Sequence, residues 1–304
     1  MKPGITIIGS SNTDMVINAD HLPGPGETIL GRSFFMNPGG KGANQAVAAA
    51  RLGGNITFIC KTGDDIFGKQ SLLLFEKEGI NTSYLLSDSK NPSGVALITV
   101  DKNGENCIVV ASGANAVLLP SDLLQALETI SKSSMILMQL EIPLVTVTYI
   151  AAIAFEKKIP VVLNPAPACV IPDKLLRYIS ILTPNEKEAE MLSGIKINSI
   201  ETVKEAAVKI KSRGVKTVII TLGSKGALVF HENVFTLIPA ISVEARDTTA
   251  AGDVFNGALV VALSEGKDII VATRFACKAS SLSVTRMGAQ VSSPYHWEVE
   301  AFTK

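Results

Sequence analysis

The sequence predicts an α/β fold: a doubly wound, mostly parallel sheet flanked by helices, with a small β-sheet lid projecting from it. Short apolar runs alternate regularly with helical segments, and the composition is 47% hydrophobic but only 5% aromatic. Both observations are typical of a parallel sheet buried between helices. Two segments break this alternation, which predicts the projecting sheet. With 304 residues, the chain can form two small domains or one large α/β domain.

Charge and composition exclude several classes of partner. Lys plus Arg equals Asp plus Glu at 28 each, so no basic field would attract nucleic acid, and a small-molecule ligand is expected. The longest apolar region, residues 135–155, contains Gln139, Glu141 and Pro143, which predicts a strand, a turn and a helix rather than a membrane span. The four cysteines lie far apart without paired ligand spacing, which predicts neither a zinc site nor disulfides and favours a cytoplasmic protein.

The first element is a short apolar run from Ile5 to Gly9, typical of a buried parallel strand whose carboxyl end faces a ligand crevice. The polar residues that follow do not complete the G-x-G-x-x-G pattern, which counts against dinucleotide binding. Among them, Asn12 and Asp14 together can donate to and accept from a sugar diol. The alternative for these two residues is an Asx turn after the strand.

Two segments, approximately 13–38 and 92–113, are predicted to form the small sheet. The first has little helical period and contains a Pro-Gly-Pro-Gly turn sequence at 23–26. In the second, two strand-like runs flank residues 101–104, where Asn-Gly is a strong hairpin signal. We expect this sheet to close over a site as a lid, and its apolar face to be covered by the lid of a second copy in a homodimer.

A glycine cluster at 39–42 leads into an Ala-rich helix that ends before Gly53. The cluster is not a Walker A loop, because Lys41 lies between glycines and no Ser or Thr follows it. A tight turn with close helix packing would explain two glycines alone. Gly40, Lys41 and Asn44 add backbone donors, a charge and an amide at a helix start, which favours a site for a polar ligand.

The middle of the chain repeats one arrangement, in which polar residues follow the carboxyl end of a buried strand. The predicted strands are 135–139, 161–164, 179–183 and 217–221. Because open α/β sheets bind ligands at this edge, the repetition predicts one shared crevice. Asn185 and Glu188 share a helix face, where their oxygens would suit Mg²⁺. From these residues alone, a capped and solvated helix is the favoured interpretation of the pair.

The segment 247–253 places Asp247 and Asp253 six residues apart, ahead of an apolar run that predicts a buried helix. Small residues before a helix leave N–H groups free at the positive end of its dipole, which is a site for an anion such as a phosphate. Asp253 then has two interpretations. It caps the helix, or it accepts a proton from a nucleophile that attacks the anion.

Taken together, these motifs resemble the ribokinase family of carbohydrate kinases over essentially the whole chain. Two family signatures lie at 39–44 and 247–253, and the segments 139–141, 164–168, 183–186 and 221–224 also match. The resemblance implies one domain over residues 1–304 and ATP-dependent phosphorylation of the 5-hydroxyl of D-ribose. It places the chain nearer the ribose-specific members than the adenosine- or fructose-phosphate-specific ones.

The resemblance also implies roles for individual residues. Asp253 is the expected base, and the N–H groups of Ala250, Ala251 and Gly252 are the expected anion hole. The sugar-contacting positions, besides Asp253, are Asn12, Asp14, Gly40, Lys41, Asn44 and Glu141. The ATP-contacting positions are Asn185, Thr221, Gly223, Ser224, Gly226, Gly252 and Cys277.

The same resemblance implies that the protein binds two cations. Asn185 and Glu188 match an N-x-x-E feature tied to Mg²⁺, or another divalent cation, and to phosphate. A loop that binds an activating monovalent cation, K⁺, maps onto Asp247, Thr249, Ser283, Arg286, Gly288 and Ser292, several through backbone carbonyls.

Three alternatives stay open at this point. The chain phosphorylates another small sugar, with deoxyribose the nearest, or it is a non-catalytic sugar- or nucleotide-binding relative. An NAD-dependent oxidoreductase on a doubly wound sheet is the third, against which the missing glycine pattern after residues 5–9 counts.

Overall fold

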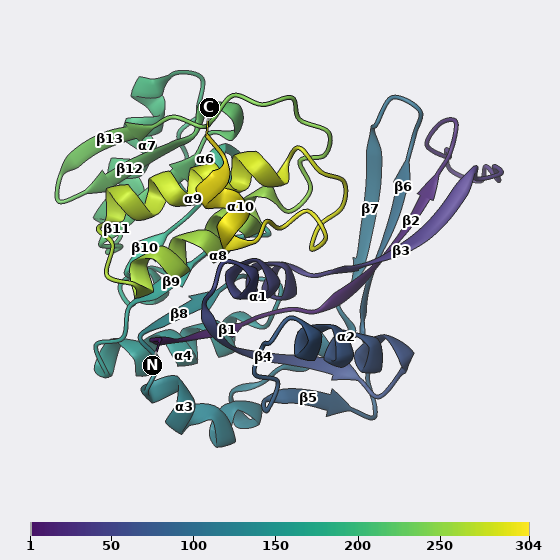
Figure 1. Cartoon of the computed structure of the whole chain (residues 1–304), viewed down its shortest axis with the longest axis horizontal. Coiled ribbons are helices and arrows are strands. Elements are labelled where there is room, and N and C mark those ends of the chain that lie inside the picture. The colour runs from purple at the N-terminus through teal and green to yellow at the C-terminus, as the bar shows by residue number, and fades with distance from the viewer. Residues whose placement is uncertain (1, 304) are drawn as a thin grey trace.

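The computed structural model describes residues 2–303, and within them a nine-stranded sheet forms the centre of the molecule (Figure 1). β12 is antiparallel to both of its neighbours, and the other neighbouring strands are parallel. The predicted doubly wound, mostly parallel sheet is therefore confirmed. Its strands in spatial order are β13 (Val234–Ile238), β12 (Ala227–His231), β11 (Thr217–Thr221), β10 (Ile181–Leu182), β9 (Val161–Leu163), β8 (Met135–Met138), β1 (Gly4–Ile8), β4 (Asn55–Gly63) and β5 (Leu85–Asp88).

The central strands are apolar on both sides because helices cover both faces of the sheet. On β1, Ile5 and Ile7 join the core under one helical layer, whereas Ile8 joins the core under the other. On β8, Leu137 and Met138 divide between the two cores in the same way. A strand buried on both faces needs a continuous apolar run rather than alternation, which is why these runs were recognisable in the sequence.

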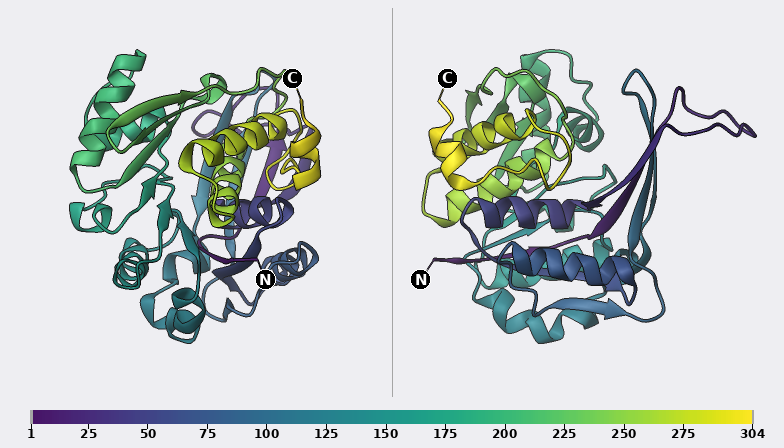
Figure 2. Two further views of the ribbon diagram at one scale, coloured as in Figure 1. Left: turned by 60° about the vertical axis from the view of Figure 1, so that its left-hand side comes forward. Right: turned by 45° about the vertical axis from the view of Figure 1, so that its right-hand side comes forward.

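The helices form two layers, seen on opposite sides of the sheet in Figures 1 and 2. One layer contains α1 (Lys41–Arg51), α2 (Ile66–Lys77), α8 (Ala251–Ser264), α9 (Ile269–Ser283) and α10 (His296–Ala301). The other contains α3 (Leu127–Ser131), α4 (Leu144–Glu156), α5 (Asp173–Leu176), α6 (Glu186–Ser193) and α7 (Ile200–Ser212). Short 3₁₀ turns occur at Gly113–Val117, Pro120–Ala126 and Gly223–Lys225. None of the helices in residues 2–303 has the length and apolar character needed to cross a membrane.

A second sheet of four strands projects from this body (Figure 2, right). Its strands in spatial order are β3 (Ser33–Gly39), β2 (Asn12–Asn18), β6 (Gly94–Val100) and β7 (Asn106–Ala111). The predicted hairpin joins β6 to β7: the Asp101 carboxylate accepts the N–H groups of Asn103 and Glu105, and Gly104 adopts a φ of 82°. A positive φ at this position favours glycine, so the Asn-Gly signal had a local physical cause.

Asn12 and Asp14 lie in strand β2, not in an Asx turn. Residues Asn12–Asn18 pair with β3 on one side and with β6 on the other. Two ladders of backbone hydrogen bonds therefore satisfy the groups that a local turn would have used. As a consequence, Asp14 is held on a strand at the base of the projecting sheet, on the same face as Ala96 and Val110 of β6 and β7.

Candidate active site

Helix α8 begins with free backbone donors. Ala250 precedes it with φ 59° and ψ 11°, a left-handed conformation that is uncommon for a residue other than glycine. The first intrahelical bond runs from the N–H of Val254 to the carbonyl of Ala250 at 2.9 Å, so the N–H groups of Gly252 and Asp253 have no partner within the helix. No side chain of the described residues caps this helix. Its start is thus suited to an anion.

Asp253 lies in the first turn of α8 and is only 6% exposed. Its carboxylate accepts hydrogen bonds from Asn44 Nδ2 at 3.0 Å and from Gln45 Nε2 at 2.9 Å, both on α1. Because it bonds to another helix and not to the N–H groups of its own, the helix-cap interpretation is wrong. Burial raises the pKa of Asp253, while the charge of Lys41 and the two amide donors lower it. The group is thus a buried carboxyl beside an anion site, as a general base requires.

The start of α1 brings three side chains to Asp253. Gly40 precedes the helix with a φ of 87°, and a Cβ there would lie 2.7 Å from the backbone nitrogen of Asn12, so the close contact needs glycine. Asn44 and Gln45 follow within the first turn and a half and contact the carboxylate directly. Burial lowers the pKa of Lys41, but the surrounding carboxylates, with Asp253 the strongest, raise it overall. The ammonium charge at this position therefore stays fixed at neutral pH.

Asp14 and Glu141 approach the same place from the small sheet and from the end of β8. Burial raises the pKa of Asp14 to about 6, helped by the charges of Glu141 and Asp253 and opposed by Lys41. The Glu141 carboxylate accepts the N–H of Lys41 at 2.9 Å and the hydroxyl of Ser10. Three carboxyl groups are therefore gathered around one ammonium group.

A cavity of about 440 Å³ has Asn12, Glu141 and Val110 in its wall, whereas the other predicted sugar contacts, Asp14, Gly40, Lys41, Asn44 and Asp253, do not line it. Asn115 Nδ2 donates to Asn12 Oδ1 at 2.8 Å, which leaves the Asn12 amide nitrogen to donate elsewhere. Asn44 Oδ1 is buried with no partner, and so is an available acceptor. Donors and acceptors thus lie together near Asp253, as recognition of a polyhydroxyl ligand requires.

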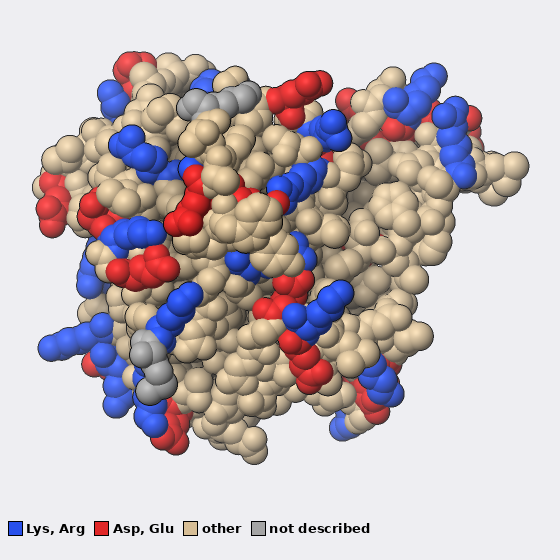
Figure 3. All heavy atoms as spheres, viewed as in Figure 1, with Lys and Arg blue, Asp and Glu red and all other residues tan. Residues whose placement is uncertain are grey.

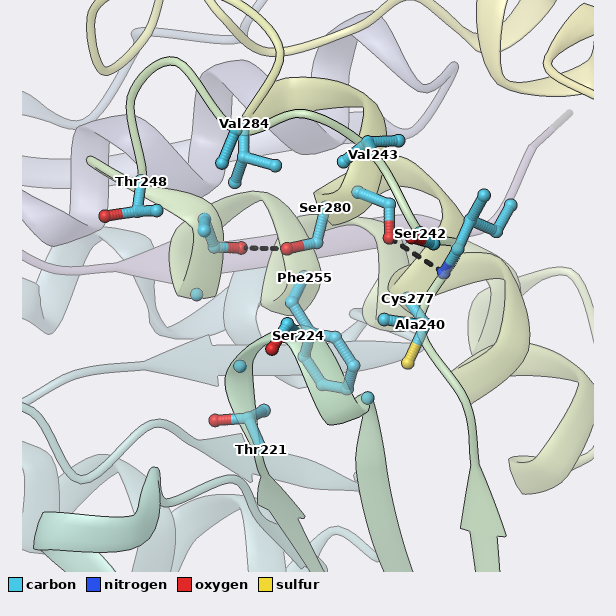
Figure 4. A pocket seen from close by; sticks show the side chains of 17 residues that line it. Thr221, Ser224, Ala240, Ser242, Val243, Thr248, Phe255, Cys277, Ser280 and Val284 are labelled. Atoms are coloured by element: carbon cyan, nitrogen blue, oxygen red, sulfur yellow. Dashed lines mark hydrogen bonds between the residues drawn. The ribbon is translucent and has the colours of Figure 1, made fainter. Parts of the chain in front are cut away.

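A second cavity, of about 280 Å³, lies at the start of α8, with Ala251 and Gly252 in its wall (Figure 4). In Figure 4 the Phe255 side chain stands in its middle, with Thr221 and Ser224 at one end and Ala240, Val243 and Cys277 around it. The Ser280 hydroxyl donates to the carbonyl of Ala251 at 2.9 Å. Six of the seven predicted ATP-contacting residues line this cavity, namely Thr221, Gly223, Ser224, Gly226, Gly252 and Cys277.

The seventh predicted ATP-contacting residue, Asn185, does not line this cavity. It lies next to it, because its backbone forms an isolated parallel β-bridge with Thr221. Asn185 and Glu188 cap α6 reciprocally: Asn185 N–H and Nδ2 donate to the two carboxylate oxygens of Glu188, each at 2.9 Å. The capping expected for this pair is present, but Glu188 is 7% exposed and not solvated. Its charge acts on both Lys41 and Asp253, so it lies close enough to influence the site.

The residues expected around K⁺ lie in two loops that are joined by hydrogen bonds. Asp247 accepts the N–H of Thr249 at 2.9 Å and the N–H of Gly288 at 2.8 Å. Burial raises the pKa of Asp247, but these hydrogen bonds lower it overall, so the carboxylate is ionised. The Arg286 guanidinium pairs with Glu298. The hydroxyls of Ser283 and Ser292 donate to nearby carbonyls.

The far end of α1 holds the second of these loops. Arg51 donates to the carbonyls of Gln290 at 2.8 Å and Ser293 at 3.1 Å, and it pairs with Glu78 through both of its remaining nitrogens. The Arg51 and Glu78 side chains are 12% and 9% exposed. A buried, bidentate arginine fixes the loop to the helix with defined geometry.

Sequence reasoning missed several residues of this site. Gln45 donates to both Asp253 and Asn164, which is 119 positions away, and neither Gln45 nor Asn164 was given a role, although Asn164 begins the matching segment 164–168. The wall of the second cavity also includes Phe255, Ser280 and the segment 240–243. Phe255 and Ser280 lie on helices whose side chains were expected to pack, and 240–243 has no regular structure that a pattern would predict.

A helix start with free N–H groups, a buried carboxyl beside it, a cavity walled by Asn12 and Glu141 and a second cavity at the helix start define a phosphotransferase that acts on a small polar molecule. The chain matches the pfkB family of carbohydrate kinases over residues 2–295. It belongs to that family, and the resemblance recognised from the two motifs is confirmed.

Three relatives are especially informative. The chain is 45% identical to a ribokinase of Haemophilus influenzae over 302 residues, which is 99% of each chain. It is 38% identical to a deoxyribokinase of Salmonella typhi, over 95% of each chain. Its fold matches the solved structure of Arabidopsis thaliana ribokinase complexed with ribose and ATP with a TM-score of 0.94, at 34% identity, over 99% of this chain and 98% of that one.

Proposed function

We propose that this protein is a ribokinase, which transfers the γ-phosphoryl group of ATP to the 5-hydroxyl of D-ribose. The main observation is the position of Asp253, a buried carboxyl in the first turn of α8 beside the free N–H groups of the helix start. The ribokinases among its relatives, similar over nearly their whole length, support ribose as the substrate.

The proposed reaction follows from this geometry. Asp253 takes the proton of the sugar hydroxyl, the hydroxyl oxygen forms a bond to the γ-phosphorus, and the bond from that phosphorus to the bridging oxygen of ADP breaks. The N–H groups of Ala250 and Gly252 stabilise the negative charge on the transferring group, and the N–H of Ala251, which donates to the carbonyl of Thr248 at 3.2 Å, joins them when it leaves that carbonyl. Lys41 offsets the charge of the ionised base. Phosphoryl transfer offers little covalent work to the protein, so positioning and charge stabilisation supply most of the rate.

Both cavities then have an occupant. Asn12, Asp14, Gly40, Lys41, Asn44 and Glu141 hold the sugar hydroxyls. The cavity around Phe255 and Cys277 takes the adenosine, and Thr221, Gly223, Ser224, Gly226 and Asn185 lie along the path to the phosphates. The unpartnered acceptor Asn44 Oδ1 and the free donor of Asn12 support this assignment on the sugar side.

Two cations belong to the proposal. When bound, Mg²⁺ neutralises charge on the β- and γ-phosphates. Both Glu188 oxygens are already bonded to Asn185, so this pair suits an indirect contact through water. The ionised Asp247, joined to Thr249 and Gly288, suits a nearby K⁺ held by backbone carbonyls of the two loops. Replacing K⁺ with a bulky organic cation should then depress the rate several-fold, and an unchanged rate would contradict the cation site.

The small sheet is proposed to act as a lid and as a dimer interface. The face that carries Asp14 also carries Val110, which lines the sugar-side cavity. The opposite face exposes apolar side chains: Ile17 (43%), Phe34 (58%), Met36 (50%), Leu97 (54%) and Val109 (63%). In Figure 3 the charged side chains of this sheet gather near its tip, leaving its flank largely uncharged. A second copy would cover such a face.

The oligomeric state of the purified protein tests the proposed dimer interface on the small sheet. Light scattering of the purified chain should give twice the monomer mass, and Phe34→Asp, which places a charge on the apolar face, should give a monomer. A wild-type monomer would contradict the interface. A location in the cytoplasm, where ATP is available, completes the proposal, and the four unpaired cysteines are in keeping with a reducing compartment.

A panel of pentoses and hexoses with ATP, Mg²⁺ and K⁺ tests the activity. We expect the highest kcat/KM for ribose, with 2-deoxyribose clearly lower, because a site built to bond a hydroxyl penalises an analogue that lacks it. A preference for deoxyribose would identify the chain as a deoxyribokinase, the activity named for one of its relatives. No phosphorylation of any sugar would leave a non-catalytic binding protein as the better description.

A further inference from the structure

The side chain of Gln45 is fully buried and contacts three parts of the chain at once. Its Nε2 donates to Asp253 Oδ1 at 2.9 Å and to Asn164 Oδ1 at 3.1 Å. Its Oε1 accepts a hydrogen bond from Gln139 Nε2. Gln139, at the end of β8, is also fully buried, and Asn164, at the end of β9, is 7% exposed. The glycine motif that precedes Gln45 assigns none of these three amides a role.

The neighbours of Gln45 fix the direction of its amide. Gln139 directs its NH₂ group at Gln45 Oε1, which leaves the Gln45 nitrogen to face Asp253, while Gln139 Oε1 is buried without a partner among the described residues. Asn164 Nδ2 donates to the carbonyl of Thr183 at 3.2 Å, which leaves Asn164 Oδ1 as an acceptor for Gln45. Turning the Gln45 amide over would place its oxygen against two other oxygens and its nitrogen against that of Gln139. Buried polar groups left without partners are costly, so one orientation is strongly favoured.

The network continues to the anion site. The Thr183 hydroxyl donates to Asn256 Oδ1 at 2.7 Å, and Asn256 Nδ2 donates to the carbonyl of Gly252 at 2.8 Å. Thr183 and Asn256 are each 1% exposed. The ends of β8, β9 and β10 are therefore connected through buried hydrogen bonds both to Asp253 and to the backbone at the start of α8.

We propose that Gln45 is a positioning residue for phosphoryl transfer, which holds the Asp253 carboxylate in one orientation and favours its ionised form, and that Gln139 and Asn164 set the direction of its amide. The inference rests on the proposed function, since it concerns Asp253 as the base. An amide is suited to this role because it donates to the carboxylate without adding a charge. The base receives one donor from Asn44 on its other oxygen, so the loss of Gln45 leaves it held at one side only.

Other charged groups also act on Asp253, and their effects must stay constant in the test. Lys41 on α1 favours its ionised form, whereas Glu141 after β8, Glu188 on α6 and Asp14 on β2 oppose it. None of these side chains hydrogen-bonds to Gln45 Nε2, whose acceptors are Asp253 and Asn164. Substituting Gln45 therefore changes the local donor and leaves the four charges in place.

The test is the pH dependence of kcat between pH 5 and 9, with the KM for ribose and the melting temperature measured on the same preparations. Gln45→Leu and Gln45→Met both remove the donor without adding a charge. Both substitutions should raise the pH at which kcat falls to half of its plateau on the acidic side, which is the acid limb of the profile. The expected rise is about one pH unit or more, because a hydrogen bond to a charged group favours the ionised form by roughly that amount. We expect kcat at neutral pH to fall about tenfold with a small change in KM.

Val47→Ala is the matched control, because Val47 is also fully buried on α1 but contributes apolar packing only. It should lower the melting temperature and leave the acid limb in place. If Gln45→Leu lowers the melting temperature without moving the acid limb, Gln45 has a packing role and the inference is wrong.

Two further variants separate the possible failures. If the Gln45 variants do not fold, Gln139→Met removes the amide that orients Gln45 and should move the acid limb in the same direction by a smaller amount; an unmoved limb in that variant also overturns the inference. Asp253→Asn tests the base itself. If it loses turnover while the Gln45 and Gln139 variants keep the wild-type acid limb, the proposed function stands and only the positioning role fails.

Discussion

The surroundings of the Asp253 carboxyl and the cavity at the start of α8 differ in charge. On the sugar side, Asp14, Lys41, Glu141 and Asp253 lie close enough to shift one another's pKa values. On the nucleotide side, no charged side chain of the described residues lines the cavity. A sugar is neutral and its hydroxyl is a weak nucleophile, so the protein must supply the charge there. ATP brings its own charge, and its adenosine needs walls of suitable shape and the free N–H groups of a helix start.

The largest effect is expected on the sugar side, at the base. Asp253→Asn keeps the size of the side chain and one of its two hydrogen bonds from α1 but cannot accept the proton, so kcat should fall at least about a hundredfold. Ribose should still bind, as isothermal titration calorimetry can measure, because the other sugar contacts remain. Turnover near that of the wild type would show that the charged side of the site does not perform the chemistry.

A smaller effect is expected at Asp14, which is proposed to bind the sugar without taking part in proton transfer. Asp14→Ala should lower kcat/KM for ribose by about tenfold or more, the typical effect of losing a hydrogen bond to a charged group. The KM for ATP should stay the same, because Asp14 does not line the cavity around Phe255 and Cys277. Steady-state kinetics with each substrate varied in turn would detect the difference, and equal changes in both KM values would remove the division between the two cavities.

Asp14 should also affect stability, in a direction set by its pKa. The pKa of Asp14 is raised from 3.8 to about 6, so between these values the folded state binds more protons than the unfolded state. Stability is therefore highest below about pH 4, decreases as the pH rises to about 6, and is constant above it as far as this group is concerned. In Asp14→Asn this decrease should be absent, so that the melting temperature above pH 6 exceeds that of the wild type. A lower melting temperature at pH 7 would contradict the assigned cost of the ionised carboxyl.

The smallest effect is expected on the nucleotide side. Cys277 is 5% exposed, and burial raises the pKa of its thiol to about 12, so it contributes neutral surface to the cavity. Cys277→Ser should change the KM for ATP by no more than about twofold, the usual range for a substitution that removes no specific contact. A tenfold change would show that this side of the site depends on one polar contact more than its neutral lining indicates.

The sequence was informative wherever one short segment contained the whole signal. The buried strands, the hairpin at 101–104 and the helix after Asp253 each depend on local patterns, and each is present. The role of Gln45 could not be found in this way, because its partners Gln139, Asn164 and Asp253 are distant in the sequence and meet only after the sheet forms. Asp14 was recognised from its chemistry, but its position on a strand could not be, because partners on both sides define that strand.

Helix α1 has 11 residues and is about 16 Å long at 1.5 Å per residue. Its first turn contacts Asp253, and its last residue, Arg51, holds the carbonyls of the loop at 290–293. A helix of this length is stiff along its axis, so we expect a displacement of the loop at 290–293 to move the end of α1 that contacts Asp253. A change that shifts the loop should therefore alter sugar affinity, although no atom of the loop needs to reach the sugar.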